Sequence, residues 1–352
     1  EPAYETPSFR RSDAFGATGR EVRGVRGGVG INEVHNFGKY RVTGPRARNW
    51  LDRIMAGRIP DPGRVSLTPM LSPRGRLIGD FTISCLNAAE FQLTASYGSQ
   101  AVHFRWLKQH QEDGVNTENI SDKRNGFQIA GPYARDVLAR CTRTDLSGMR
   151  FLDVRRMTVG MTNCIVQRVS YTGDLGYEIW VKPASLARLY DDLMAAGSDF
   201  DIRPFGARAL NALRLEKNYG SWGREYRPLY GPVEVGLDRF VAYDKPADFI
   251  GKKAALAERY NGGSKRLISL AVAAVDADVI GDEPVSIDGA VVGWVTSGGF
   301  AHASKTSVAL AMVPKEFALR NDGWTVELLG QSLKASLINK PLFDANASRM
   351  RS

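Results

Sequence analysis

The chain has 352 residues, of which 43% are hydrophobic and 24% charged, an ordinary globular composition that excludes a disordered, collagen-like or fibrous protein and, at this length, predicts two or three domains. Its 47 Lys and Arg residues against 38 Asp and Glu give a net charge of +9, which favours anionic small molecules, acidic partners or nucleic acid without choosing among them. The longest strongly apolar stretch, residues 267–275, is far shorter than the roughly 20 residues of a membrane-spanning helix, so no membrane association is expected.

Cysteine and histidine usage predicts neither a disulfide framework nor a metal site. The three cysteines are widely spaced and the four histidines lack metal-ligand spacing, which favours a reducing compartment: the cytoplasm, or the mitochondrial matrix in a eukaryote. The basic residues are dispersed, so nucleic-acid binding is not expected. No signal peptide is visible, and a chain that begins with Glu1 is expected to be processed or cut from a longer polypeptide.

Two segments repeat one pattern of strand, Gly-Pro turn and helix. They are Tyr-Arg-Val-Thr-Gly-Pro-Arg-Ala-Arg-Asn-Trp-Leu at residues 40–51 and Phe-Gln-Ile-Ala-Gly-Pro-Tyr-Ala-Arg-Asp-Val-Leu at residues 127–138. A looser third copy has a strand over residues 177–181 and a helix that ends near Gly197, where a capping glycine is typical. Recurring units of this kind predict an α+β plait built from split βαβ units, rather than a doubly wound parallel sheet.

The last quarter of the chain has a different texture. After a linker-like Asn-Gly-Gly-Ser at residues 261–264, short alternating segments are separated by turns near residues 288, 298 and 322. Several short strands at this spacing predict a small all-β barrel or sandwich. We therefore expect two α+β units followed by a β domain.

Three charged residues suit chemistry, and each also has a structural alternative. Asp80 enters a predicted strand after a Pro-Arg-Gly turn and suits either a general base or a solvated turn. Glu178 lies inside an apolar strand, where a carboxylate is costly unless it is paired or accepts several N–H bonds; it suits a structural partner of an arginine or a ligand with two adjacent donors. Arg208 lies in the first turn of a predicted helix and suits either a bound carboxylate or a surface ion pair.

Taken together and in this order, these segments resemble the aminomethyltransferase family, the glycine-cleavage T-proteins. The most specific piece is Tyr-Thr-Gly-Asp-Leu-Gly-Tyr-Glu at residues 171–178. Further matching phrases lie at residues 206–216, 232–237, 248–252, 295–298 and 307–311. Within the family, residues 37–44 and 227–232 are most similar to the folate-binding C-terminal region of dimethylglycine and sarcosine dehydrogenases, in which a flavin domain comes first.

The resemblance implies an α+β fold of three domains, a cloverleaf with ferredoxin-like plait units around a central folate funnel and a C-terminal β-barrel. We expect a discontinuous folate-binding domain over residues 1–45 and 118–260. A plait domain is expected over residues 46–117, and the barrel over residues 261–352.

The resemblance also implies a site. Asp80 falls where the family carries its catalytic acid, although Gly79 replaces the first member of the usual Asp-Asp pair. Tyr171 and Glu178 match the residues that contact the pterin. Leu67 stands where many relatives have tyrosine. The residues expected to bind the cofactor are Tyr171, Glu178, Arg208, Leu67, Met70 and Trp222.

The function implied is tetrahydrofolate-dependent one-carbon transfer, forming 5,10-methylene-tetrahydrofolate from an iminium or formaldehyde unit derived from an N-methylated glycine. Tetrahydrofolate is the expected cofactor, with no flavin site in this chain. The expected partners are folate, a small methylated amine or its iminium, and a flavin-containing domain or subunit. Two alternatives stay open: a free-standing tetrahydrofolate-dependent demethylase acting on an S-, N- or O-methyl donor, and a folate-binding module without catalysis.

Overall fold

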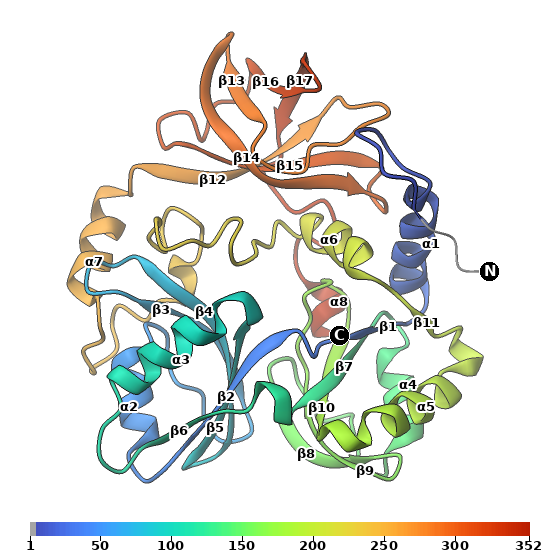
Figure 1. Cartoon of the computed structure of the whole chain (residues 1–352), viewed down its shortest axis with the longest axis vertical. Helices are drawn as coiled ribbons and strands as arrows, with labels where there is room; N and C mark the ends of the chain where they lie inside the picture. Colours follow the sequence, from blue (N-terminus) through green and yellow to red (C-terminus); the bar gives the residue numbers. More distant parts are fainter. Residues whose placement is uncertain (1–4) are drawn as a thin grey trace.

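The computed structural model describes residues 5–352, and its chain forms three lobes around the middle of the molecule (Figure 1). One lobe is built on a six-stranded sheet, one on a five-stranded sheet and one on a closed barrel. The α+β fold with a C-terminal β-barrel is therefore confirmed.

The six-stranded sheet buries one face under helices. Its strand order is β11 (Arg203–Pro204), β1 (Gly30–Glu33), β7 (Asn125–Ala130), β10 (Gly176–Val181), β9 (Thr162–Gln167) and β8 (Val154–Val159). The apolar face packs against α4 (Ala134–Cys141) and α5 (Leu186–Ala196), and Tyr177 and Ile179 of β10 belong to that core. Because side chains alternate along a strand, Glu178 points to the opposite face.

The five-stranded sheet is built in the same way. Its order is β3 (Val65–Leu71), β4 (Leu77–Asn87), β5 (Glu90–Ser96), β2 (Phe37–Thr43) and β6 (Asn116–Asn119). Phe81, Ile83 and Cys85 of β4 share a core with α2 (Ala47–Ile54) and residues of α3 (Gln100–Gln109). Alternation along β4 therefore turns Asp80 and Ser84 away from these helices.

The position of β2 corrects the expected domain boundary. A boundary at residue 45 would leave β2 with the six-stranded sheet, but β2 pairs with β5 along its whole length and with β6 along half of it. The chain thus crosses between the sheets after β1, near residue 35. The strand pattern of β2 is the same whichever sheet it joins, so the sequence alone did not show this.

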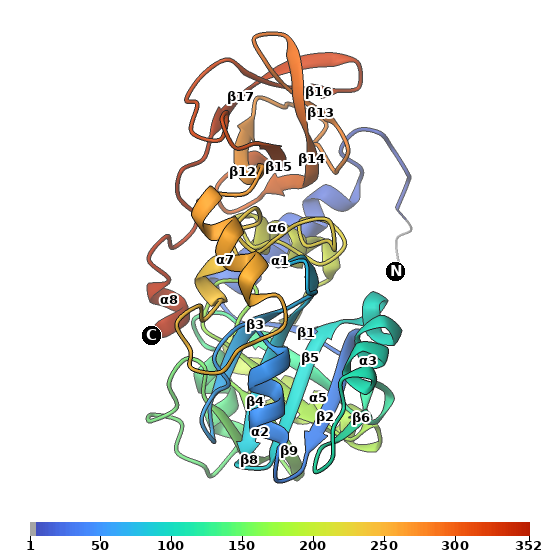
Figure 2. The same ribbon diagram turned by 90° about the vertical axis from the view of Figure 1, so that its left-hand side faces the viewer.

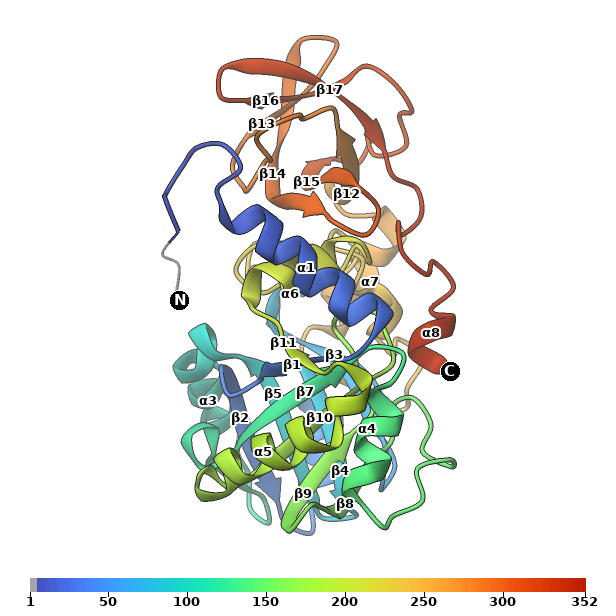
Figure 3. The ribbon, with the colours of Figure 1, turned by 90° about the vertical axis from the view of Figure 1, so that its right-hand side faces the viewer.

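The barrel starts just after the linker-like segment that the sequence marks. It is formed by β12 (Lys265–Val272), β15 (Thr306–Pro314), β14 (Ala290–Ala301), β13 (Pro284–Ile287), β16 (Trp324–Leu328) and β17 (Gln331–Leu337). Helices α6 (Ala207–Leu215) and α7 (Lys252–Asn261) lie between the barrel and the two sheets (Figure 2). Helix α1 (Ala14–Gly27) runs beside α6 below the barrel (Figure 3), and α8 (Ser348–Arg351) lies near the end of the chain.

The repeated Gly-Pro pattern has the same geometry in both places. Gly44 follows β2 and Gly131 follows β7, with φ angles of +128° and +133°. A Cβ atom at Gly44 would lie 2.1 Å from the carbonyl oxygen of Gly114, and one at Gly131 would lie 2.3 Å from that of Gly28. Each glycine is therefore needed both for its backbone angle and for a close approach of a second segment.

Among residues 5–352, no helix combines the length and apolar character needed to cross a bilayer. In the same part of the chain, no three His, Cys, Asp or Glu side chains converge as metal ligands, and Cys85, Cys141 and Cys164 are free thiols.

We predict that Gly131→Ala lowers the free energy of unfolding by at least about 1–3 kcal/mol, because it forces both backbone strain and a clash. Gly24→Ala is the matched control, since nothing lies within 4 Å of the added Cβ atom in helix α1; it should leave stability unchanged or raise it by up to about 1 kcal/mol. Urea denaturation of the two variants measures this, and equal stabilities would contradict the role given to Gly131.

Candidate functional site

A chain of side-chain hydrogen bonds links the facing sides of the two sheets. Ser84 of β4 donates through Oγ to Oε1 of Gln167 at 2.6 Å, and Nε2 of Gln167 donates to Oε2 of Glu178. Ser84 and Gln167 are almost fully buried. Asp80 lies four residues before Ser84 on the same face of β4, roughly 13 Å away along the strand. The predicted acid and the predicted pterin ligand therefore project into the layer between the same two sheets.

Asp80 is a partly buried acid, one of whose oxygens is sealed from solvent. Its Oδ1 atom is sealed from solvent and has no hydrogen-bond partner among the described residues. Burial raises the pKa of the carboxyl from 3.8 to about 7, which its own backbone N–H offsets only in part. A buried carboxyl without a charged partner is typical of a group that acts on a ligand.

Tyr171 lies close to Asp80. Its hydroxyl donates to the carbonyl oxygen of Gly220 at 2.8 Å, and its ring stacks on that of Tyr219 at 6.0 Å. Burial raises the pKa of Tyr171 and that of Tyr226, and the carboxylate of Asp80 raises both further. These side chains therefore share one poorly solvated neighbourhood with Asp80.

Glu178 is held by the amide of Gln167 and not by an arginine. On its two neighbouring strands it lies opposite Gln128 and Gln167. Burial raises the pKa of its carboxyl from 4.5 to about 7, and the bond from Gln167 and the nearby indole of Trp180 lower it in part. The sequence left open that Glu178 is the structural partner of an arginine, but the two neighbouring strands place glutamines, and no arginine, opposite it.

Trp222 packs on His103, whose ring occupies the space that a side chain at position 79 would need. Its indole Nε1 donates to Ser99 Oγ, and its ring meets that of His103 edge-on at 5.6 Å. A Cβ atom at Gly79 would lie 2.7 Å from His103 Nε2 and 2.6 Å from the ring of Phe81. An acid at position 79 is thus excluded by packing, and Asp80 stands alone.

His103 is neutral in this setting. Burial lowers its pKa to about 4, and Nε2 lies 3.0 Å from the carbonyl oxygen of Ile78. Its buried Nδ1 has no partner among residues 5–352.

Leu67 and Met70 lie on opposite faces of β3. Leu67 pairs with Thr82, on the face of Asp80, and is 43% exposed. Met70 pairs with Gly79 and is fully buried in the core beneath α2 and α3. The sequence prediction gave both residues as binding the cofactor, but only Leu67 lies on the face of Asp80.

Arg208 is engaged elsewhere. It lies in the first turn of α6, is exposed, and forms a two-pronged ion pair with Glu5. No hydrogen bond or ion pair in the described part of the chain joins Arg208 to the other predicted site residues. Its role in binding stays a prediction.

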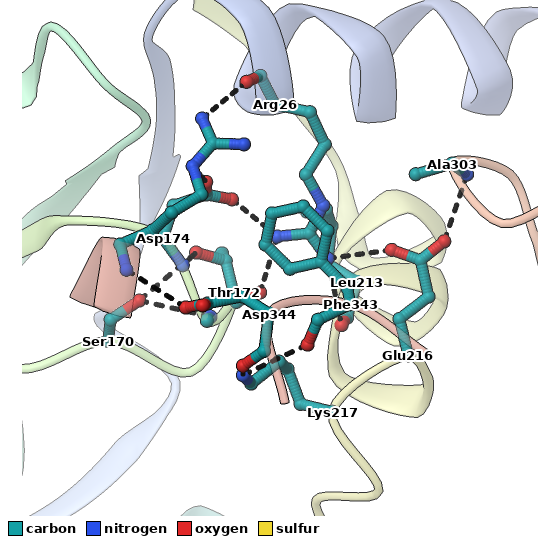
Figure 4. A network of polar contacts seen from close by, with 12 residues as sticks. Arg26, Ser170, Thr172, Asp174, Leu213, Glu216, Lys217, Ala303, Phe343 and Asp344 are labelled. Carbon is teal, nitrogen blue, oxygen red and sulfur yellow. Dashed lines mark hydrogen bonds and ion pairs between the residues drawn. The ribbon is translucent and has the colours of Figure 1, made fainter. Parts of the chain in front are cut away.

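Two acids of the matching motifs belong to a buried ion network (Figure 4). Arg26 of α1 pairs with Asp174, just after Tyr171, and with Glu216 after α6, the latter at 2.7 Å. Arg349 reaches Asp174 at 3.2 Å, and the ring of Phe343 covers the guanidinium of Arg26 at 3.5 Å. The network fixes the Tyr171 segment to α1, α6 and the last residues of the chain.

A second network joins the segment of Trp222 to the barrel. Glu225 is fully buried and accepts hydrogen bonds from the hydroxyls of Thr296 and Ser297 on β14. Arg214 of α6 pairs with Glu225 at 3.3 Å and donates to Ser297 at 2.8 Å. Unlike Asp80 and Glu178, this acid has an arginine partner and several donors.

Two surface hollows lie outside this region. One is at the C-terminal end of α1, beside Gly27 and Tyr133, and one is next to α8, beside Pro132 and Leu175. Neither hollow is lined by a predicted site residue, so the candidate site is described by the side chains between the two sheets, from Asp80 and Ser84 to Gln167 and Glu178.

We predict that Asp80→Asn stabilises the protein at alkaline pH. The folded state binds the Asp80 proton more tightly than the unfolded state, because burial raises the pKa of this carboxyl in the fold. Ionisation of Asp80 therefore lowers the free energy of unfolding progressively as pH rises from about 4 to about 7, and no further above that range. The variant should raise Tm at pH 8 by at least about 2 °C, the change expected for roughly 1.5 kcal/mol in a chain of this size, and should approach the parent at pH 4, where most of the cost has not yet arisen. Thermal melts at both pH values measure this. Glu327→Gln, an exposed position on β16, is the control, and an Asp80→Asn melt that follows it at both pH values would contradict the burial of a lone acid.

Comparisons with known proteins agree with this architecture. The GCVT N-terminal domain family matches residues 2–245, and the glycine cleavage T-protein C-terminal barrel domain matches residues 265–344. The aminomethyltransferase of Bartonella henselae superimposes with a TM-score of 0.86, covering 97% of this chain and 95% of that one at 21% identity, which shows the fold.

Two relatives are similar in sequence. The mitochondrial dimethylglycine dehydrogenase of Mus musculus is 38% identical over 359 residues, which is 100% of this chain and 41% of the relative. The chain thus spans less than half the length of that protein. The aminomethyltransferase of Koribacter versatilis is 32% identical over 333 residues, covering 92% of this chain and 87% of the relative. The chain belongs to the glycine-cleavage T-protein (aminomethyltransferase) family.

Proposed function

We propose that this chain binds tetrahydrofolate and transfers a one-carbon unit to it, forming 5,10-methylene-tetrahydrofolate. The observation that carries the proposal is a pair of partly buried carboxyls, Asp80 and Glu178, whose pKa values are both raised to about 7 by burial and which project into the layer between two sheets. Family membership supports the same reading. Tetrahydrofolate supplies the nitrogen atoms that take up the one-carbon unit.

Glu178 binds the flat head of the pteridine. The 2-amino group and the adjacent ring N–H are two parallel donors, which a single carboxylate accepts side by side. A carboxylate has about four acceptor positions, and Gln167 uses one of them at Oε2. Each charge-assisted bond contributes about 1.5–3 kcal/mol, so Glu178 is a main source of affinity.

Asp80 orients and exchanges the proton at the reacting edge. Its unpartnered, buried Oδ1 fits a group that receives a donor from the ligand. A carboxyl with a pKa near 7 both accepts and returns a proton at physiological pH, and a positioned group of this kind contributes about 10²–10⁴-fold to the rate.

Other predicted residues complete the site. Tyr171 offers a flat aromatic surface beside Asp80, and Trp222 offers a second one next to His103. Leu67 offers an apolar surface on the face of Asp80. Arg208 would leave Glu5 to take an acceptor on the benzoyl-glutamate arm, and the net charge of +9 favours the polyanionic tail of folylpolyglutamates.

The one-carbon donor is an iminium or formaldehyde unit derived from an N-methylated glycine, made by a flavin-containing domain or subunit. Support comes from the similarity to a dimethylglycine dehydrogenase, whose remaining length lies outside the match. That relative is mitochondrial by name, which favours the matrix for a eukaryotic source and the cytoplasm otherwise.

Two substitutions should separate binding from chemistry. Glu178→Gln should weaken tetrahydrofolate binding by about 10- to 100-fold, since it removes the charge from the acceptor. Asp80→Asn should lower the turnover rate by about 10²–10⁴-fold and change the Kd little. Titration calorimetry gives the Kd, and chromatography of the folate product with formaldehyde as donor gives the rate.

Glu327→Gln is again the control and should match the parent in both assays. Parent protein that does not bind tetrahydrofolate at high micromolar concentration would contradict the proposal. A 5-methyl product formed from a methyl donor would instead support the demethylase, and binding without turnover in the parent would support a non-catalytic module.

A further inference from the structure

Gln167 uses the two ends of its amide for two different partners. It is the last residue of β9 and is fully buried. Its Oε1 accepts the Ser84 hydroxyl of β4 at 2.6 Å, while its Nε2 donates to Oε2 of Glu178 on β10. The side chain therefore spans from the strand that carries Asp80 to the strand that carries Glu178.

The direction of the amide is fixed by chemistry. A carboxylate accepts hydrogen bonds and cannot donate them, so the NH₂ end of Gln167 must face Glu178. Turning the amide over would place its carbonyl oxygen against the carboxylate. Since the carbonyl end is already satisfied by Ser84, the observed orientation leaves neither end of this buried amide unpaired.

We propose that Gln167 is a positioning residue for folate binding, which anchors the Glu178 carboxylate to strand β4 and holds it in its ionised, acceptor form. This inference rests on the proposed function, because it assigns Glu178 the pteridine head as its ligand. Nothing in the sequence pattern singles out Gln167, which ends a strand that also begins with polar residues, Thr162 and Asn163.

The surroundings of Glu178 leave Gln167 as its main polar support. On β7, the opposing Gln128 donates to Asn32 Oδ1 at 3.0 Å. Trp180, two residues along β10, places its indole nearby, but the buried Nε1 forms no hydrogen bond among residues 5–352, and Lys39 of β2 lies 5.5 Å from that ring. No charged side chain is among the causes that shift the pKa of Glu178: burial raises it, and of the two groups that lower it Gln167 has the larger effect.

The test is the pH dependence of tetrahydrofolate binding in the full chain. In the parent, affinity should fall as pH drops through about 7, because protonated Glu178 loses its acceptor capacity. Gln167→Met has nearly the same length without the donor, and should move the midpoint up by about one pH unit. That shift weakens binding by roughly fivefold at pH 7 and leaves binding at pH 9 within about twofold to threefold of the parent.

Two further variants sharpen the result. Gln128→Met removes an amide from the same row of the sheet that bonds Asn32 and not Glu178, so its midpoint should equal that of the parent. Ser84→Ala frees the carbonyl end of Gln167 and should give a smaller shift in the same direction as Gln167→Met.

A second readout needs no folate. The pKa of the Glu178 carboxyl, followed by ¹³C NMR in the free protein, should rise in Gln167→Met and stay constant in Gln128→Met. An unchanged pKa would overturn the positioning role even if folate binding fell. Uniformly weaker binding at every pH, with a lower Tm, would also overturn it, because it indicates only a structural role. Parent protein that does not bind folate would refute the proposed function first, and the inference with it.

Discussion

Removing a carboxylate from water is expensive unless donors or cations replace the water, and this constraint divides the fully and the partly buried acids around the candidate site into two groups. Asp174 and Glu216 share Arg26, and Glu225 has Arg214 and two hydroxyls. Among residues 5–352, no cation pairs with Asp80 or Glu178, and burial raises the pKa of each to about 7. The first group closes networks inside the protein, whereas the second leaves acceptor capacity facing the layer between the sheets.

The paired acids explain how the unpaired ones are held in place. A buried ion pair is costly to break, by about 3–5 kcal/mol, although it adds little over an apolar core. The pairs around Arg26 fix the segment that leads from Tyr171 into β10. The pair between Arg214 and Glu225 fixes the segment of Trp222 against the barrel. The site is therefore assembled by contacts among all three lobes, and no single lobe contains it.

Much of the fold could be predicted from local pattern. The Gly-Pro repeat at Gly44 and Gly131, the linker and the barrel each leave a short-range signal, and the structure has all of them. Which sheet β2 joins depends on contacts with strands far away in the sequence, and the alternation of apolar and polar residues along β2 does not encode it. That choice is why the expected boundary at residue 45 was wrong.

The site was predicted less completely. Glu178 stood out because a charged residue interrupts an apolar strand, but Gln167, at the end of a strand that also contains Thr162 and Asn163, gives a weaker signal. Alternation along β3 already separates Leu67 from Met70, three residues apart, and the prediction did not apply it. The exclusion of an acid at Gly79 depends on His103 from α3, which only the packed structure brings into contact.

The central claim is that the layer between β4 and β10 receives one ligand, held by Glu178 and faced by Asp80. The most direct measurement is a crystal structure of the chain with bound tetrahydrofolate. We expect the pteridine N–H donors on the Glu178 carboxylate and the reactive nitrogen edge beside Asp80. Folate bound elsewhere, with both carboxyls still facing only protein atoms, would contradict the account.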